Sequence, residues 1–330
     1  MINPTFVAMN QKLKIGVLGA GHLGKIHLRL LQESSAYELV GFYDSQPQIA
    51  AKISREFGYR SFSEVDSLLD EVDVIDIVTP TISHFELGKK ALEKGLHIFL
   101  EKPITATVEE ANELVSSAKA KGLLGMVGQV ERFNPALMAA NPYINTPMFI
   151  ETHRLAEFNP RGTDVSVVLD LMIHDIDAIL SVVQSKVIDV QASGVSIISE
   201  TPDIANARLR FENGCVANLT ASRISMKTMR KSRFFQRDAY VSVDFFEKKT
   251  EVVRMQNAPE SAQDFAMILE NAEGVKKQIF FDNPEVKEGN AILMELEHFA
   301  DAIYNNKEPI VSLQAGTSAL EVAHQILNCF

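Results

Sequence analysis

The chain has 330 residues, enough for two domains, and its 46% hydrophobic and 23% charged residues are ordinary for a globular protein, which excludes collagen-like and disordered chains. It contains no run of about 18 or more uncharged apolar residues, so the sequence predicts neither a membrane-spanning helix nor a membrane partner. The net charge of −11, from 43 acidic and 32 basic residues, repels polyanions, so a nucleic acid is not an expected partner.

The N-terminal residues 1–10 lack a basic region followed by a long apolar run, so they do not resemble a secretory signal. We expect them to form a loose extension. The two cysteines, Cys215 and Cys329, lie far apart in the sequence and form no CxxC pair. Free thiols are typical of a reducing compartment, so the sequence predicts a cytoplasmic protein without a cysteine-based metal site.

From residue 11 to residue 135, short apolar runs alternate with segments of helical spacing. The expected strands span residues 14–18, 38–43, 72–78, 97–100 and 123–128. The expected helices span residues 22–34, 46–58, 84–95 and 107–122. This alternation predicts an α/β Rossmann domain, a doubly wound parallel sheet in which ligands bind at the carboxyl ends of the strands.

A glycine-rich turn joins the first expected strand to the helix that follows it. Its residues are Gly19, Ala20, Gly21, His22, Leu23 and Gly24. The first glycine permits a tight turn, the second lets the backbone approach a pyrophosphate, and the third lets the helix pack on the strand. A plain tight turn without a ligand is the alternative. We predict that this turn binds a dinucleotide.

Asp44 follows the second expected strand, 20 residues after Gly24. At this position a carboxylate accepts hydrogen bonds from both hydroxyl groups of the adenine ribose and repels a 2′-phosphate. The sequence therefore predicts NAD as the cofactor in preference to NADP. An ordinary cap at the end of a strand is the alternative for Asp44.

Glu101, Lys102 and Pro103 follow the expected strand at residues 97–100. At the carboxyl edge of a parallel sheet, a lysine can reach the nicotinamide and a substrate hydroxyl, where its charge stabilises a developing alkoxide. Taken in isolation, a Glu-Lys pair at a strand end is also typical of a solvated loop.

The second half, residues 136–330, changes character. One long expected helix spans residues 164–184, and two closing helices span residues 294–305 and 316–327. The expected strands span residues 187–198, 204–212, 215–225, 230–236, 239–246 and 250–255. Asn213-Gly214 is typical of a two-residue hairpin turn. We expect an α+β domain with an open, largely antiparallel sheet, which binds substrate and mediates oligomerisation.

Asp170 and His174 lie four residues apart in the expected helix over residues 164–184, so their side chains are neighbours. Asp170 can orient His174 and raise its basicity, so that His174 takes a proton from a substrate hydroxyl. Asp177 is expected on the same polar side, opposite an apolar face. A solvated polar stripe is one alternative. A metal pair is another, but no convincing third ligand is present, so no metal is predicted.

A basic stretch over residues 223–237 contains no acidic residue. Its members are Arg223, Lys227, Arg230, Lys231, Arg233 and Arg237. In an acidic protein such a cluster suits a diphosphate, whereas a solvated sheet edge or a subunit contact is the alternative. Arg154 and Arg161, close in sequence to the helix expected over residues 164–184, are further candidates for this role.

Five segments together resemble the Gfo/Idh/MocA family of sugar and cyclitol dehydrogenases. In chain order they are GAGHLGKIH, TPTISH, ALEKGLHIFLEKPIT, ERFNP and LDLMIHDID. The resemblance implies that Lys102, Asp170 and His174 line the site where nicotinamide meets substrate. The cofactor-binding residues that it implies, beyond the glycine-rich turn and Asp44, are Thr79, Pro80, His84, Glu101 and Lys102. The expected substrate ligands are Arg132, Arg154, Arg161 and Arg233. Family members pair through the open sheet, which implies a homodimer or homotetramer.

Within the family, further segments resemble the branch that acts on nucleotide sugars. They imply an NAD-dependent dehydrogenase that oxidises a sugar secondary alcohol to a ketone, with the 3-hydroxyl of a UDP-linked N-acetylhexosamine as the expected target. His174, assisted by Asp170, is the expected base and Lys102 steadies the oxyanion, although Lys102 is an alternative base. A dehydrogenase of a free sugar or inositol is the second reading. An NAD-binding sensor or regulatory protein is a third, and it would not need Lys102 or His174.

Overall fold

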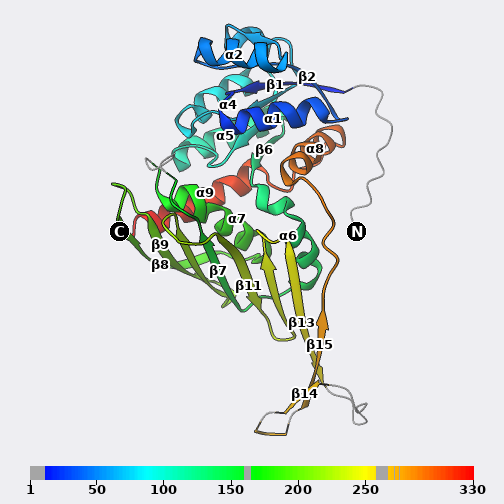
Figure 1. Ribbon diagram of the computed structural model, residues 1–330, viewed down its shortest axis with the longest axis vertical. Coiled ribbons are helices and arrows are strands. Elements are labelled where there is room, and N and C mark those ends of the chain that lie inside the picture. Colours follow the sequence, from blue (N-terminus) through cyan, green and yellow to red (C-terminus); the bar gives the residue numbers. More distant parts are fainter. Residues whose placement is uncertain (1–11, 160–164, 258–266, 271, 275) are drawn as a thin grey trace. The chain divides into compact units, whose positions relative to one another are not determined.

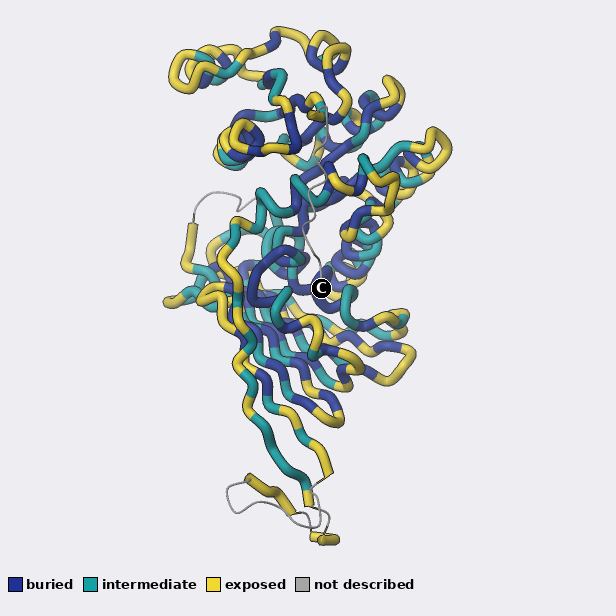
Figure 2. The backbone as a smooth tube through the Cα atoms, turned by 90° about the vertical axis from the view of Figure 1, so that its right-hand side faces the viewer, coloured by how far each residue is buried: buried dark blue, intermediate teal, exposed yellow. Residues whose placement is uncertain are grey.

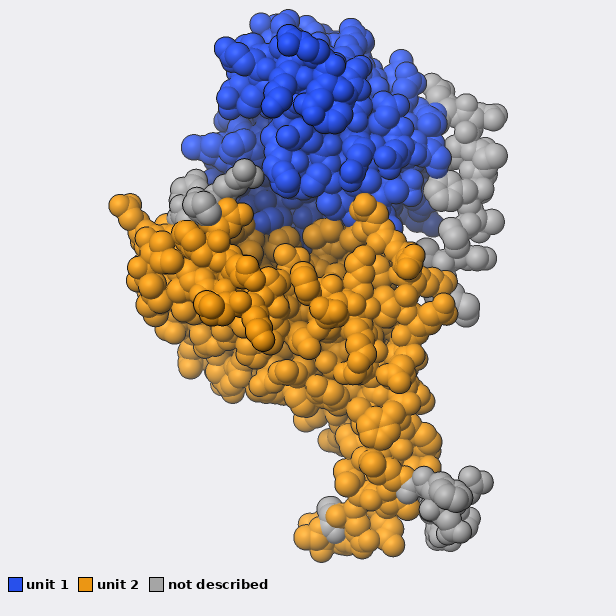
Figure 3. All heavy atoms as spheres, viewed as in Figure 1, with its two compact units in different colours: residues 1–129, 292–317 blue, residues 130–291, 318–330 orange. Residues whose placement is uncertain are grey.

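The structure, a computed structural model, describes residues 12–159, 165–257, 267–270, 272–274 and 276–330. The extension expected at residues 1–10 lies outside the described residues. The chain divides into two compact units (Figure 3): unit 1 comprises residues 1–129 and 292–317, and unit 2 comprises residues 130–291 and 318–330. None of the described helices is long and apolar enough to cross a membrane.

Unit 1 is built on a six-stranded parallel sheet with the strand order β3-β2-β1-β4-β5-β6 (Figure 1). Its strands are β1 Leu13–Leu18, β2 Tyr37–Tyr43, β3 Ser61–Phe62, β4 Val74–Ile77, β5 His97–Glu101 and β6 Gly125–Gly128. Its helices are α1 His22–Glu33, α2 Pro47–Phe57, α3 Val65–Leu69, α4 His84–Glu93, α5 Val108–Lys121 and α8 Ala291–Tyr304. The strand order reverses between β1 and β4, which is the switch point where doubly wound sheets bind ligands.

The predicted elements of the first half are confirmed, and their ends follow the expected signals. Thr107 and Glu110 form a capping box at the start of α5, and Gly58 and Gly122 adopt left-handed conformations that end α2 and α5. The short β3 and α3 were not predicted, because a two-residue strand and a five-residue helix are too short to show periodicity.

Unit 1 also contains a segment from the end of the chain, so the second domain is not continuous over residues 136–330 as expected. Met126 of β6 pairs with Ser312, and the N–H of Val127 donates to the carbonyl of Val311. A Cβ on Gly125 would approach the Leu313 side chain to 2.6 Å, so these segments are in close contact. Hydrophobic periodicity shows that a segment is helical, but it does not show against which sheet the segment packs.

Unit 2 contains a nine-stranded sheet with the order β14-β15-β13-β12-β11-β7-β10-β9-β8 in its described part. The strands are β7 Phe149–Leu155, β8 Val187–Val195, β9 Ile204–Phe211, β10 Val216–Ser222, β11 Met229–Phe235, β12 Ala239–Asp244, β13 Lys249–Asn257, β14 Met267–Glu270 and β15 Lys276–Asp282. Among the strands that the structure describes in this sheet, only β7 and β10 pair in parallel. Gly214, with φ 89°, turns the chain between β9 and β10 as expected. The prediction of an open, largely antiparallel sheet is confirmed.

One face of this sheet is buried beneath helices. Buried and exposed residues alternate along the strands (Figure 2). The buried residues pack with α6 Pro135–Ala140, α7 Ile173–Val182 and the C-terminal part of α9 Leu313–Leu327. Phe234 of β11 and Ile176 of α7 belong to this core, so α7 lies on the same face of the sheet as Phe234.

The central strand β7 was missed by the sequence analysis. Its inward-facing residues are Ile150, Thr152 and Arg154, all buried, while Glu151 and His153 alternate with them on the other face. Because two of the three inward positions are polar, the strand shows no apolar alternation. The tertiary structure supplies the partners that make this burial possible.

The helix expected over residues 164–184 is shorter and less regular. It begins as a π-helix over Val168–Met172 and continues as α7 from Ile173 to Val182. Asp170 therefore lies in the π-helical turn and His174 in the first turn of α7. Such π-helical turns are rare and occur frequently at functional sites.

Candidate functional site

The glycine-rich turn of unit 1 needs glycine for steric reasons. Gly19 has φ 93°, and a Cβ there would lie 2.7 Å from the carbonyl oxygen of Val78. A Cβ on Gly24 would lie 2.1 Å from the carbonyl oxygen of Gly19. A Cβ on Gly21, by contrast, would meet nothing within 4 Å, so the turn is open at this residue.

Gly21 is also the N-cap of α1, and no side chain caps this helix end. The first backbone N–H groups of α1 therefore face the open side of the turn, where His22 is exposed and Leu23 is half-buried. A helix N-terminus with free N–H groups and room for a ligand binds a phosphate anion. This geometry fits the pyrophosphate of a dinucleotide.

Asp44 also forms hydrogen bonds with the backbone, which the sequence did not reveal. Its Oδ2 accepts a hydrogen bond of 2.8 Å from the N–H of Ala20, and its Oδ1 accepts one of 2.9 Å from the N–H of Gln46. The carboxylate thus anchors the glycine-rich turn to the end of β2. Each oxygen retains a lone pair for a ribose hydroxyl.

His84 lies differently from what its prediction as a cofactor ligand requires. Its side chain is 1% exposed, with Nδ1 2.9 Å from the carbonyl oxygen of Pro103 and Nε2 2.9 Å from that of Thr79. The ring therefore braces the loop after β4 against the loop after β5, and it does not reach a ligand. The neighbouring Thr79 and Pro80 are more accessible and remain candidates for cofactor contact.

Glu101 is buried at the end of β5, and Lys102 beside it is half-buried. One carboxylate oxygen of Glu101 accepts a hydrogen bond of 3.2 Å from the N–H of Lys102, and the other lies 3.3 Å from Nε2 of His27. The Lys102–Pro103 peptide is cis. His27 was not among the predicted site residues, because a single histidine in a helix carries no signal of its partners.

In unit 2, Asp170 and His174 are half-buried, whereas Met172, Ile173 and Ile176 of the same helix are buried. Asp177 was expected beside them on a polar side, but it is 1% exposed and points inward, as does Asp175 at 2%. The apolar spacing of this helix was correctly predicted. Inward-facing carboxylates interrupt it because Arg154 neutralises Asp175 and Arg132 neutralises Asp177.

Arg154 of β7 is the centre of this buried charge network. Its guanidinium donates to both oxygens of Asp175, at 3.0 and 2.9 Å, and to Glu131 at 2.8 Å. Burial alone lowers the pKa of Arg154, but the attraction of Asp175 and Glu131 outweighs it and raises the pKa above its usual value. A second bidentate pair joins Arg132 to Asp177, at 2.7 and 3.2 Å.

Arg154 and Arg132, two of the predicted substrate ligands, are therefore engaged in ion pairs within the protein. Arg154 is only 3% exposed and is held by two carboxylates, so a diphosphate would have to displace its ion pairs. Arg132 is partly exposed but forms a bidentate pair with the buried Asp177, which gives it a structural role. Arg161 lies outside the described residues.

Arg233 lies on the wrong face of the sheet for binding substrate beside α7. It alternates along β11 with Ser232 and Phe234, whose side chains are buried in the core beneath α7. On the opposite face Arg233 lies 3.5 Å from Glu151. The prediction of Arg233 as a substrate ligand rested on the charge of the stretch, which does not indicate the face of the strand.

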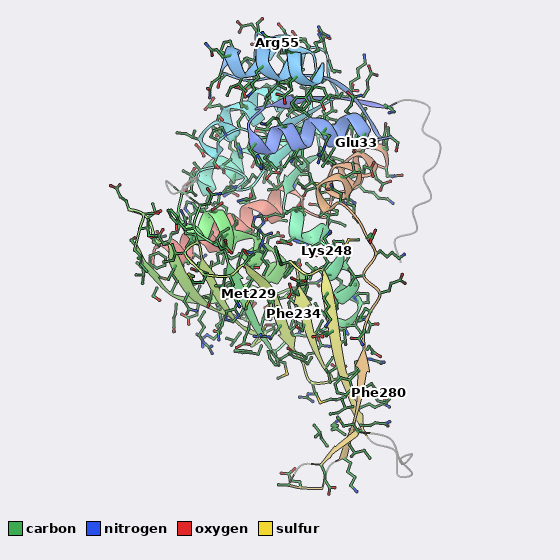
Figure 4. The ribbon with its side chains drawn as sticks, viewed as in Figure 1. Glu33, Arg55, Met229, Phe234, Lys248 and Phe280 are labelled. Atoms are coloured by element: carbon green, nitrogen blue, oxygen red, sulfur yellow. The ribbon has the colours of Figure 1, made fainter. Side chains whose placement is uncertain are left out.

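Arg230, unlike Arg233, lies on the face of the sheet that α7 covers. Arg230 lies four residues before Phe234 on β11, so its side chain shares the face of Phe234. Figure 4 labels Phe234 and Met229, the residue before Arg230. Arg230 is exposed, it pairs in register with Arg154, and its charge acts on Asp175, the neighbour of His174. Strand alternation from Phe234 was the sequence signal that could have identified it.

In the described part of the chain, no three His, Cys, Asp or Glu side chains are grouped to hold a metal ion. The groups that the structure assembles are instead a phosphate-binding turn in unit 1 and an Asp170–His174 helix with an exposed arginine nearby in unit 2. The first suits a dinucleotide, and the second suits acid–base chemistry on an anionic substrate.

Comparisons with known proteins identify the family of the chain. Residues 13–129 match the model of an oxidoreductase family with an NAD-binding Rossmann fold, and residues 125–236 match that of the Gfo/Idh/MocA C-terminal domain. The chain is 33% identical over 315 residues to UDP-N-acetylglucosamine 3-dehydrogenase of Acidithiobacillus ferrooxidans, covering 95% of this chain and 96% of that protein. It is 28% identical over 343 residues to scyllo-inositol 2-dehydrogenase (NAD(+)) of Bacillus subtilis, covering 98% and 95%.

Solved structures give the same result. The UDP-N-acetylglucosamine 3-dehydrogenase of A. ferrooxidans superposes with a TM-score of 0.85 at 32% identity, covering 97% of this chain and 98% of that one. Levoglucosan dehydrogenase in complex with NADH superposes with a TM-score of 0.81 at 21% identity, covering 97% of each chain, which shows a shared fold. NAD as the cofactor and the dehydrogenase class are confirmed.

The network around Arg154 gives a stability prediction. Arg154→Met leaves Asp175 and Glu131 buried without their cation, so we expect the free energy of unfolding to fall by about 3–5 kcal/mol. Arg233→Met removes a partly exposed pair, and its effect should stay within about 1 kcal/mol. Urea denaturation followed by circular dichroism measures both. Equal midpoints for Arg154→Met and wild type would show that the network does not stabilise the fold.

Proposed function

Because the chain belongs to the Gfo/Idh/MocA family of oxidoreductases, we propose that this dehydrogenase oxidises a secondary hydroxyl of a sugar to a ketone, and that the sugar is a UDP-linked N-acetylhexosamine oxidised at its 3-hydroxyl. The observation that carries the proposal is the similarity to UDP-N-acetylglucosamine 3-dehydrogenase, which extends over 95% of this chain and therefore includes both units. The experiment that tests it is the oxidation of UDP-sugars with NAD.

The proposed chemistry divides among three side chains. When bound, NAD supplies the acceptor for the hydride. His174 removes the proton of the sugar hydroxyl, and Asp170 orients the imidazole and stabilises its charged form. Lys102 stabilises the negative charge that develops on the oxygen. Lys102 as the base, with His174 as the stabilising group, is the alternative assignment.

Arg230 is the residue that we propose for the diphosphate of the substrate. An exposed guanidinium on the α7 face offers planar, charged N–H groups to phosphate oxygens. Arg154 stands opposite it in register, but the carboxylates of Asp175 and Glu131 neutralise that charge. Arg230 therefore keeps the charge that is available for an anionic ligand.

A second candidate substrate is a free sugar or an inositol. The observation that favours it is the similarity to scyllo-inositol 2-dehydrogenase, which covers 98% of this chain. This reading has no use for an exposed arginine beside α7, because an uncharged polyol presents no anion. The contribution of Arg230 to substrate selection thus distinguishes the two readings.

We also propose that the chain forms a homodimer or homotetramer through the open face of the unit 2 sheet. The described helices of unit 2 lie on the other face of this sheet (Figure 1). The open face carries Glu151, His153 and Arg233, whose mixed charges suit a symmetric contact.

Cofactor choice gives one prediction. The wild type should prefer NAD to NADP by at least about tenfold in kcat/KM, roughly 1.4 kcal/mol, because the Asp44 carboxylate repels a 2′-phosphate. Asp44→Ser should narrow this ratio, and because Asp44 also holds the N–H of Ala20, it should weaken NAD binding too. Steady-state kinetics with both cofactors measures the ratio, and equal use of both by the wild type would contradict the prediction.

The catalytic roles assigned to Lys102, His174 and Asp170 give a second prediction. Lys102→Met and His174→Ala should each lower kcat by about a hundredfold or more, the usual range for a lost acid–base or electrostatic group. Asp170→Asn should be intermediate, because it keeps the shape and removes the charge. NAD affinity, measured by calorimetry, should change little. A variant with near-normal turnover would refute the role assigned to that residue.

Two arginines on opposite faces of one strand provide a matched test of substrate class. Arg230→Glu should raise KM for UDP-N-acetylglucosamine by at least about tenfold, whereas Arg233→Glu should leave it within about twofold. Neither change should alter the affinity for NAD. The assay is NAD reduction with the ketone drawn off, using UDP-sugars, free N-acetylglucosamine and myo-inositol.

The comparison of substrates decides between the two readings. If free glucose or myo-inositol is oxidised with a higher kcat/KM than every UDP-sugar, the nucleotide-sugar proposal is withdrawn and the dehydrogenase class stands. If UDP-sugars are preferred but Arg230→Glu and Arg233→Glu behave alike, the substrate class is right and the assigned diphosphate ligand is wrong.

A further inference from the structure

A buried histidine joins two carboxylates inside the NAD-binding unit. His27 of α1, 0% exposed, has its Nδ1 2.8 Å from Oδ2 of Asp76 in β4. Its Nε2 lies 3.3 Å from Oε1 of Glu101 at the end of β5, too poorly aligned for a full hydrogen bond but close enough for strong attraction. The Phe99 ring packs edge-on against the imidazole.

The two carboxylates keep the imidazole charged. Burial alone lowers the pKa of His27, but the charge and hydrogen bond of Asp76, reinforced by Glu101, outweigh burial and hold the pKa well above its usual value. Tyr37 is a further buried titratable group near Asp76, and its hydroxyl donates to the carbonyl of Leu296. Burial raises the pKa of Tyr37, and the charges of Asp76, Tyr304 and Glu297 raise it further. The imidazolium therefore holds Asp76 and Glu101 together across two strands.

Glu101 is fixed from three directions. His27 attracts one oxygen, the N–H of Lys102 donates to the other, and Gly128 of β6 packs against the carboxylate. A Cβ on Gly128 would lie 2.8 Å from Oε1 of Glu101. Since φ at Gly128 is not in the left-handed region, the glycine serves the close approach of the carboxylate and not an unusual backbone conformation.

We propose that His27 is a positioning residue for the nicotinamide half of the cofactor site: it holds Glu101, and through Glu101 the backbone of Lys102, in the place that NAD requires. The inference rests on NAD binding by unit 1 and not on the identity of the sugar. It goes beyond the proposed function, which gives His27 and Asp76 no role.

The topology assigns this cluster to one half of the dinucleotide. In the strand order β3-β2-β1-β4-β5-β6, the turn after β1 takes the pyrophosphate and Asp44 after β2 faces the adenine ribose. Glu101 and Lys102 follow β5, in the half of the sheet on the other side of the switch point. This half receives the nicotinamide portion when the adenine portion lies over β2.

The energetics favour positioning over general stabilisation. Three ionisable groups buried together gain little net stability, because the desolvation of each charge offsets their attraction, and apolar residues of similar volume serve a core equally well. A buried imidazolium does, however, fix the direction of a carboxylate. This one is fixed directly beside Lys102, a residue assigned to the chemistry.

The test compares NADH with ADP-ribose, which lacks nicotinamide. Direct titration of the full-length protein with each ligand gives the two dissociation constants, by calorimetry and, for NADH, by its own fluorescence, since the chain has no tryptophan. Gly128→Ala displaces the Glu101 carboxylate without removing a charged group. His27→Asn places its amide near the position of Nδ1, so it keeps a contact with Asp76 and loses the one with Glu101.

We expect both variants to weaken the binding of NADH by at least about tenfold and the binding of ADP-ribose by no more than about twofold. His27→Gln, whose amide reaches the position of Nε2 toward Glu101, should recover part of the NADH affinity. The matched control is Gly125→Ala on the same strand, whose Cβ meets the Leu313 side chain at 2.6 Å instead of Glu101. It should lower stability without changing the ratio of the two affinities.

The pKa of His27 gives a second readout, which is measured first without a ligand. In a protein labelled with ¹³C at histidine Cε1, the resonance that disappears in His27→Gln identifies this ring among eight histidines. The positive charge of His27, which holds the Glu101 carboxylate, is fully present below about pH 6.5. It is lost as the pH rises through the raised pKa of the ring. Gly128→Ala should lower that pKa, so NADH affinity should decline at a lower pH than in wild type.

Equal loss of NADH and ADP-ribose affinity in His27→Asn would overturn the proposal and make His27 a structural residue of the whole unit. Unchanged NADH affinity in Gly128→Ala, with the ring pKa lowered, would overturn it as well. Neither measurement uses a sugar substrate. A wrong sugar assignment would therefore leave these results unaffected, and the two failures are distinguishable.

Discussion

A charge removed from water must be paired, and this constraint shapes both units. In unit 1 the imidazolium of His27 lies between Asp76 and Glu101, and in unit 2 the guanidinium of Arg154 lies between Asp175 and Glu131. Each cluster lies beside a residue assigned to chemistry: Lys102 follows Glu101, and His174 precedes Asp175. Pairing requires fixed partner positions, so each cluster fixes the backbone next to an assigned residue.

Close approach of neighbouring atoms is the second constraint, and three glycines near the proposed cofactor site satisfy it. Gly19 lies against the carbonyl of Val78, Gly24 lies against the carbonyl of Gly19, and Gly128 admits the Glu101 carboxylate. The first two shape the turn that we propose for the pyrophosphate, and the third lies against the carboxylate beside Lys102. Both halves of the proposed cofactor site therefore require glycine, because a side chain at these positions would collide with neighbouring atoms.

The sequence predicted what is encoded locally. The turn at Gly19 to Gly24, the helix over residues 107–122 and the apolar spacing of α7 are short-range patterns, and the structure confirms them. It did not predict β7, because the partners that bury Arg154 come from distant segments. It also assigned the segment around Ser312 to the second domain, because a helical pattern does not name its packing partner.

The basic stretch shows how strand geometry divides one sequence feature between two faces of a sheet. Arg230 and Arg233 belong to the same run without acidic residues, yet an odd separation of three residues along β11 sends their side chains to opposite faces. Glu151 neutralises Arg233 on the open face, where a subunit contact is proposed. Arg230 lies on the face of α7, where the neighbouring Arg154 is already neutralised, and it is the residue proposed to bind the anionic part of the substrate. The two arginines of this one sequence cluster therefore have different surroundings, and we propose a substrate role for Arg230 and a role in assembly for Arg233.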